Sequence, residues 1–147
     1  SGAEPAQAAG EAEKEPGFTR VMDLFRTALG NRVSEVRESN RLTDSPCCLV
    51  NAEGGLSTQM QRILKLANKE FPESARILEL NPKAPLIRRL CRLSANHEHE
   101  PFIKQCALQL WCNALILDGV TPEPEDLVAR VQSFMVEAAE KRSPLIL

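Results

Sequence analysis

The sequence predicts an α+β fold in which a small three-stranded sheet packs with helices and a C-terminal helical hairpin follows. Three short segments rich in apolar or β-branched residues, at 32–39, 47–50 and 76–80, are bounded by turn residues, as strands are. Other segments repeat their apolar residues with helical period, and the last two are joined only by the short connector DGVTPEP. A chain of 147 residues suffices for one domain with a modest core.

The first 16 residues differ in composition from the rest. They are rich in Ala, Glu, Gly and Pro and carry four Glu and one Lys, a net charge of −3. Without periodic apolar residues this segment cannot bury a core, so we expect a disordered acidic tail or linker. We place the folded domain at 17–141 and a tail at 142–147.

The predicted elements follow in order. The segment FTRVMDLFRTALG is a helix that begins at Phe18 and stops at Gly30. RVSEVRES is a half-exposed strand, and CCLV, after the turn Asp44-Ser45-Pro46, is a short buried strand. The segment LSTQMQRILKLANKEF is a helix, and RILEL is a strand that ends at Asn81-Pro82.

Three more helices complete the prediction: PLIRRLCRLSAN at 85–96, a helix from about Pro101 to Asp118, and a last helix that ends near Lys141. The apolar side of the 85–96 helix is formed by Leu86, Ile87, Leu90, Cys91 and Leu93. Pro101 suits a first helical turn. The short connector makes the last two helices, within 101–141, antiparallel neighbours.

The helix from Pro101 has an unusual stretch, QCALQLWCNALIL, which contains no charge and holds the only tryptophan, Trp111. It is too short for the roughly 20 residues of a membrane span, so it must be buried in protein. Its apolar residues point in nearly every direction, whereas the last helix has a narrower stripe. The stripe is Leu127, Val128, Val131, Phe134, Met135 and Ala138, opposite Glu125, Asp126, Arg130, Gln132, Glu137, Glu140 and Lys141.

Two such helices form half of a four-helix bundle, and a second copy related by a two-fold axis would supply the other half. The alternative is that the hairpin packs wholly on its own sheet. Periodicity alone favours the homodimer over this alternative without excluding it.

The helix after Gly54-Gly55 has one apolar face, formed by Leu56, Met60, Ile63, Leu64 and Ala67. Such a face usually packs on the sheet of its own domain. It can also remain exposed and bind other proteins, because flexible Met and Leu side chains adapt to varied surfaces. The pattern does not choose between these interpretations.

Three segments resemble the C-terminal dimerisation domain of heat shock protein 90 chaperones, above all their bacterial branch, high-temperature protein G. They are SNRLTDSPCCLV (39–50), LSTQMQRILK (56–65) and LELNPKAPLIRRL (78–90), in the family's order and spacing. LWCNALILDG (110–119) is similar to the family's penultimate helix. The resemblance covers about residues 18–141.

The resemblance implies a non-enzymatic module of an ATP-dependent protein-folding chaperone of the stress response. The last two helices of each protomer would form the dimer contact, with these interface residues: Leu108, Trp111, Leu115, Leu127, Val131, Phe134, Met135 and Ala138. The amphipathic helix would contact partly folded client proteins through Leu56, Met60, Ile63 and Leu64. Leu56 replaces a methionine common in bacterial relatives, and Cys47 and Cys48 replace smaller or aliphatic residues.

The family's ATP site lies in an N-terminal domain, so the resemblance implies that no cofactor binds here and that ATP and Mg²⁺ bind elsewhere in the full-length protein. The ending Ser143-Pro144-Leu145-Ile146-Leu147 differs from the Met-Glu-Glu-Val-Asp ending of eukaryotic cytosolic relatives. That difference indicates a bacterial cytoplasmic or an organellar member.

Other chemistry receives little support. The five cysteines, Cys47, Cys48, Cys91, Cys106 and Cys112, form no CxxC pair and read as reduced core residues. His97 and His99 lack the HExxH spacing of a zinc site, and Arg88, Arg89 and Arg92 read as a solvated helix face. A net charge of −2 without interleaved aromatic residues argues against nucleic-acid binding, and no segment predicts membrane binding.

Two rival functions remain: a stand-alone dimeric adaptor, and a small enzyme that uses Cys47 or the histidines.

Overall fold

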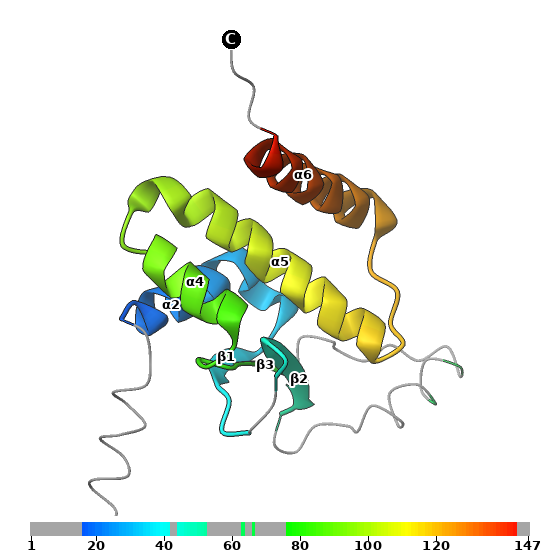
Figure 1. The fold of residues 1–147 in the computed structure, drawn as a ribbon. Helices are drawn as coiled ribbons and strands as arrows, with labels where there is room; N and C mark the ends of the chain where they lie inside the picture. Colours follow the sequence, from blue (N-terminus) through cyan, green and yellow to red (C-terminus); the bar gives the residue numbers. More distant parts are fainter. Residues whose placement is uncertain (1–15, 42–43, 53–62, 64–65, 67–75, 144–147) are drawn as a thin grey trace, which may run out of the picture.

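The computed structural model describes residues 16–41, 44–52, 63, 66 and 76–143. The described elements are α2 (Phe18–Leu29), η1 (Gly30–Arg32), β1 (Glu35–Glu38), β2 (Cys47–Asn51), β3 (Arg76–Leu80), α4 (Pro85–Leu93), η3 (His97–His99), α5 (Glu100–Leu117) and α6 (Pro124–Arg142). This is the predicted α+β class, with a small three-stranded sheet and four described helices (Figure 1). The helix predicted from 56 onwards lies outside the described residues except at two positions.

The sheet has the order β1-β3-β2, so the strand that comes last in the sequence lies in the middle. β3 pairs parallel with β1, where Arg37 lies opposite Glu79, and antiparallel with β2, where Cys48 lies opposite the same Glu79. Because both edges of β3 are covered, all five of its residues are buried, including Arg76 and Glu79. The Glu79 carboxylate forms an ion pair with Arg37 at 2.8 Å and lies 3.7 Å from Arg41.

The strand at 47–51 differs from its prediction. CCLV is apolar and reads as a buried strand, but β2 is an edge strand whose five residues are all half-buried. The strand predicted at 32–39 is also shorter, because η1 extends α2 to Arg32 and β1 begins at Glu35. Neither difference changes the fold class.

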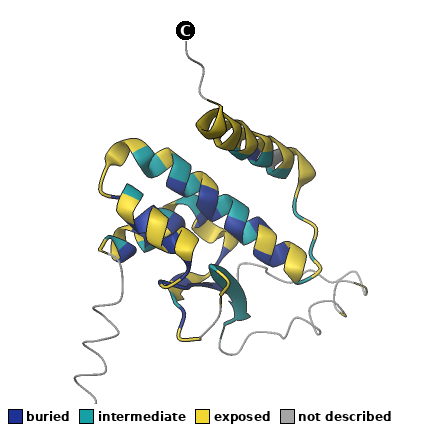
Figure 2. Cartoon of the chain, in the orientation of Figure 1, coloured by how far each residue is buried: buried dark blue, intermediate teal, exposed yellow. Residues whose placement is uncertain are grey.

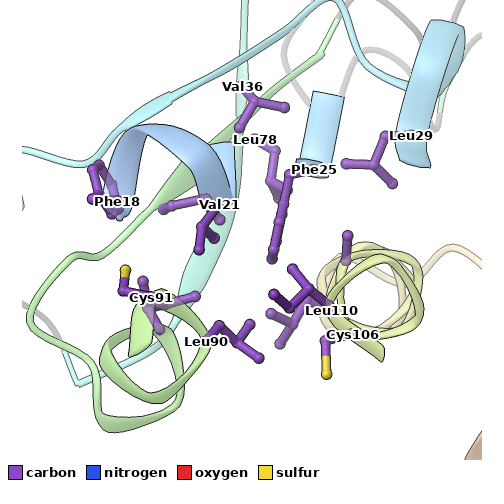
Figure 3. Packing of buried hydrophobic residues seen from close by; sticks show 14 of the residues in the cluster. Phe18, Val21, Phe25, Leu29, Val36, Leu78, Leu90, Cys91, Cys106 and Leu110 are labelled. Atoms are coloured by element: carbon purple, nitrogen blue, oxygen red, sulfur yellow. The ribbon is translucent and has the colours of Figure 1, made fainter. Parts of the chain in front are cut away.

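The core lies between the sheet and the helices α2, α4 and α5. Phe25 is fully buried at its centre, between Leu78 of the sheet and Leu110 of α5 (Figure 3). Leu90 of α4 faces the same core next to Leu110 (Figure 3). On its core side, α5 packs against α2, α4 and β2 of its own protomer.

The start of α2 is held against α4 by a close approach of the two backbones. Gly17, which precedes the helix, has φ +96°, a left-handed conformation that favours glycine. A Cβ atom at this position would lie 2.6 Å from Ser94 Oγ and 2.7 Å from the Cys91 carbonyl oxygen. Glycine is thus required here both by the backbone conformation and by the space.

Candidate interaction surface

The helical hairpin of α5 and α6 carries the candidate site, and its turn is fixed by local sequence. Gly119 has φ +82°; its N–H donates to the Ile116 carbonyl, and the N–H of Val120 donates to the Leu115 carbonyl, both at 2.9 Å. These two bonds form a Schellman motif, which ends a helix on a left-handed residue. Asp118, the last residue before Gly119, also forms an ion pair with the buried Arg76 of β3. The end of α5 is therefore attached to the middle of the sheet.

α5 is covered by α2, α4 and β2 on one side and by α6 on part of the other. Its seven buried residues are Ile103, Cys106, Ala107, Leu110, Cys112, Ala114 and Leu115. Leu108 and Trp111 are half-buried, while Ile116 and Leu117 are 49% and 85% exposed. The charge-free stretch thus has more apolar surface than the described part of the protomer covers.

α6 lies across the outer side of α5 and contacts little else among the described elements (Figure 1). Its Phe134 ring meets Phe102 edge to face, with the ring centroids 5.8 Å apart. Leu127 and Val131 are half-buried on the same side of the helix. Figure 2 shows that most of the remaining surface of α6 is exposed.

Arg130 corrects the prediction for the polar side of α6. The sequence places it opposite the apolar stripe, but it is the buried residue among the described side chains of this helix, at 9% exposure. Its Nε donates to Gln109 Oε1 and its Nη2 to Cys112 Sγ, both at 3.1 Å. Its spacing of three from Leu127 and four from Phe134 is the signal that could have identified it, since such residues share a helix face.

An exposed apolar flank remains on α6. Val128 is 50%, Met135 64% and Val136 55% exposed. At about 100° per residue, Val128 and Met135 lie about 20° apart around the helix, roughly a quarter turn away from the side that faces α5, and Val136 lies about a quarter turn further on. We call Val128, Met135 and Val136 the α6 flank.

The predicted interface residues fall into three groups. Met135 and Ala138 are exposed, and Leu108, Trp111, Leu127, Val131 and Phe134 are half-buried between α5 and α6. Leu115 is 2% exposed and packs within the protomer itself. Leu86, predicted on the buried side of its helix, is instead 38% exposed and lines an apolar groove of about 440 Å³ beside Phe102, Phe134 and Ala138.

Of the residues predicted to contact clients, Leu56, Met60 and Leu64 lie outside the described residues. Ile63 is helical and 53% exposed, and its neighbour Leu66 is helical and 87% exposed. Their helical state agrees with the element predicted there.

The thiols of Cys47, Cys48 and Cys106 resist ionisation. Burial, with a smaller contribution from Cys48, raises the pKa of Cys47 to about 12, and burial together with Glu137 raises the pKa of Cys106 to about 12. Burial and the Glu79 carboxylate also raise the pKa of Cys48. Since the thiolate is the nucleophilic form, a protonated Cys47 weighs against the cysteine-enzyme rival.

These pKa values predict alkaline destabilisation. A thiol whose pKa rises from 9.0 to about 12 on folding stabilises the protein fully below pH 9, and this stabilisation is lost as the pH rises from 9 towards 12. We expect the free energy of unfolding to be about 2 kcal/mol lower at pH 10 than at pH 8, measured by urea denaturation under reducing conditions. In the double variant Cys47→Ala, Cys106→Ala, the free energies of unfolding at pH 8 and pH 10 should differ much less. If the difference is unchanged, the raised pKa values do not belong to these two thiols.

Neither histidine belongs to a cluster of metal-ligand side chains among the described residues. His97 is exposed and its Nδ1 lies 2.5 Å from Glu100 Oε2. Within the described ranges, no three His, Cys, Asp or Glu side chains lie close enough together to hold a metal ion. Among the helices described, none is both long and apolar enough to cross a membrane.

Comparison with known proteins settles the family. The family model described as Hsp90 protein matches residues 3–144. The chain belongs to the Hsp90 family. The resemblance of its three motif segments is therefore confirmed, and the Hsp90 match also extends into the segment before residue 17.

Several relatives of this Hsp90-family chain are each named chaperone protein HtpG. The one from Geobacter metallireducens is 44% identical over 112 residues, or 74% of this chain and 17% of the relative. The one from Oleidesulfovibrio alaskensis is 37% identical over 121 residues, which are 82% of this chain and 19% of the relative. The one from Chlorobaculum tepidum is 35% identical over 135 residues, which are 90% of this chain and 21% of the relative. The chain thus spans about a fifth of the length of these curated relatives.

Proposed function

We propose that this chain is the dimerisation and client-contact part of an ATP-dependent chaperone. In this proposal, α5 and α6 of two copies form a four-helix bundle around a two-fold axis. ATP and Mg²⁺ act in another part of the full-length protein, and this chain contributes no catalytic group. Membership of a family whose relatives are named chaperones supports this assignment.

The observation that carries the proposal is the α6 flank. A helix of 19 residues contacts its own protomer through one side only and leaves Val128, Met135 and Val136 in solvent. Exposed apolar side chains concentrated on one helix are typical of an interface. A second hairpin packed against this flank would cover it, together with Ile116 and Leu117 at the end of α5.

The bundle would give the chaperone a permanent joint. Two ATPase arms held by such a joint meet at an effective concentration set by their tether rather than by the protein concentration. Obligate interfaces of this type usually bury about 2,000 Å² or more and resemble a protein core in composition. The apolar residues of α5 and α6 have this composition.

We further propose that the segment around Ile63 contacts clients. In the full-length protein, Met60→Ser together with Leu64→Ser should weaken binding of a permanently unfolded protein, reduced and carboxymethylated α-lactalbumin, at least fivefold. The reason is that two apolar side chains are lost from an adaptable surface. Fluorescence anisotropy of the labelled client would measure this change.

Leu86→Ser is the matched control, because it removes an exposed leucine from α4. It should leave client binding unchanged, and the molar mass of both variants should equal that of the parent protein. Unchanged client binding by the Met60, Leu64 variant would refute this contact and favour the stand-alone adaptor.

A further inference from the structure

A second cleft, of about 610 Å³, opens between η1, α5 and α6. Its described lining includes Arg32, Trp111 and Arg130, together with the polar residues Gln105, Thr121 and Ser133. Two guanidinium groups therefore border one cavity. Glu123 is the carboxylate among the described lining residues, and it forms no ion pair with Arg32 or Arg130.

Arg130 has a buried positive charge and uncharged partners. Its guanidinium bonds to an amide oxygen and a thiol sulfur, and no carboxylate of the described residues lies within ion-pair distance of it. Removing a cation from water without a counter-charge is costly, and buried arginines are therefore usually paired with an anion. The uncharged amide and thiol supply no counter-charge, and Arg130 borders the cleft, where an anion could supply it.

The hydrogen-bond inventory of Arg130 leaves room for such an anion. A guanidinium has five N–H donors, and the bonds to Gln109 and Cys112 use one on Nε and one on Nη2. Both donors of Nη1 and one of Nη2 remain. This end of the guanidinium is the fork that binds two oxygen atoms of a carboxylate or phosphate in parallel.

Arg32 supplies a second charge to the same cleft. Its guanidinium carbon lies 5.7 Å from the centre of the Trp111 ring, a cation–π contact, and its Nη1 donates to the Leu29 carbonyl at 3.4 Å. The ring and the carbonyl hold this otherwise exposed side chain beside the cavity. Anion binding would thus draw on one buried and one exposed arginine.

We propose that this cleft is an anion site for a carboxylate or phosphate group, with the Arg130 fork as its principal ligand and Arg32 as a second positive charge. Two sources share this chemistry: an acidic side chain of a second copy, and a small free anion. Leu108, Trp111 and Leu115 line the cleft and also belong to the predicted interface, so an acidic group of a second copy could reach it. The site itself does not depend on the proposed dimer.

Trp111 allows a direct test because it is the only tryptophan and lines the cleft. Inorganic phosphate is titrated into the 147-residue chain at constant ionic strength while tryptophan fluorescence is recorded. We expect a saturable change with half-saturation in the low millimolar range. Arg130→Met should abolish it, Arg130→Lys should raise the half-saturation concentration about tenfold through loss of the fork, and the exposed control Arg89→Met should leave it unchanged.

Arg32→Met changes an exposed residue, so it tests the site even if Arg130→Met impairs folding; it should weaken phosphate binding several-fold. The dimer dissociation constant, measured in parallel, distinguishes the two sources. An acidic side chain of a second copy predicts that phosphate and Arg130→Lys each weaken the dimer, whereas a free anion predicts an unchanged dimer. Two results together would refute the site. Phosphate would give no saturable change in tryptophan fluorescence, and the Arg130→Lys and Arg89→Met variants would have the same dimer dissociation constant.

Discussion

Glutamate at both Val128 and Met135 is expected to raise the dissociation constant of the proposed dimer at least a hundredfold. Both side chains are at least half exposed in the protomer and lie on one flank of α6. The substitutions remove their apolar burial and place charges in the bundle, and two-fold symmetry makes each loss occur twice. A hundredfold change corresponds to about 2.7 kcal/mol, which these losses exceed. Sedimentation velocity over a dilution series measures it.

The variant Thr19→Glu, Ala95→Glu is the control for added charge. Both positions are exposed and lie outside the two helices of the hairpin, on α2 and just after α4. This variant should dissociate at the same concentration as the parent protein. If it dissociates as readily as the α6 variant, net charge rather than the α6 flank controls assembly.

Gly17→Ala is expected to lower the free energy of unfolding by about 3 kcal/mol, the largest effect on folding among these substitutions. The alanine must adopt a left-handed conformation, and its Cβ would lie less than 3 Å from Ser94 Oγ and the Cys91 carbonyl oxygen. The start of α2 must then move away from α4. The melting temperature should fall by roughly 10 °C in calorimetry.

Gly30→Ala separates the two causes of that loss. Gly30 also has a positive φ, +53°, but no atom lies within 4 Å of the position its Cβ would take. Gly30→Ala should lower the free energy of unfolding by only about 1–2 kcal/mol, which is the contribution of the backbone conformation alone. The further change Ser94→Ala should not restore Gly17→Ala, because the Cys91 carbonyl remains; full recovery would contradict this packing of α2 on α4.

The elements themselves were predictable because their apolar residues recur with the periods of helix and strand. The strand Arg76–Leu80 and the helix Phe18–Leu29 occur where the patterns place them. The order of the strands was not predictable, because it depends on pairing between distant segments rather than on local pattern. The central position of β3 therefore explains why Glu79 is buried while the more apolar β2 is an edge strand.

The hairpin of α5 and α6 was also predictable only in part. The surplus of apolar surface on α5 could be anticipated from thirteen uncharged residues, and Ile116 and Leu117 are indeed exposed. The inward position of Arg130 and the outward position of Leu86 depend on how α6 crosses α5 and α4. A single-helix pattern assigns polar residues to solvent and leucines to the core, so it misplaces both residues.

The molar mass in solution tests the central claim most directly. Multi-angle light scattering of the 147-residue chain at micromolar concentration should give about twice the protomer mass of 16.3 kDa. A mass of 16.3 kDa that stays constant as the concentration is raised a hundredfold would contradict the account, because the α6 flank would then be exposed without a second copy to cover it.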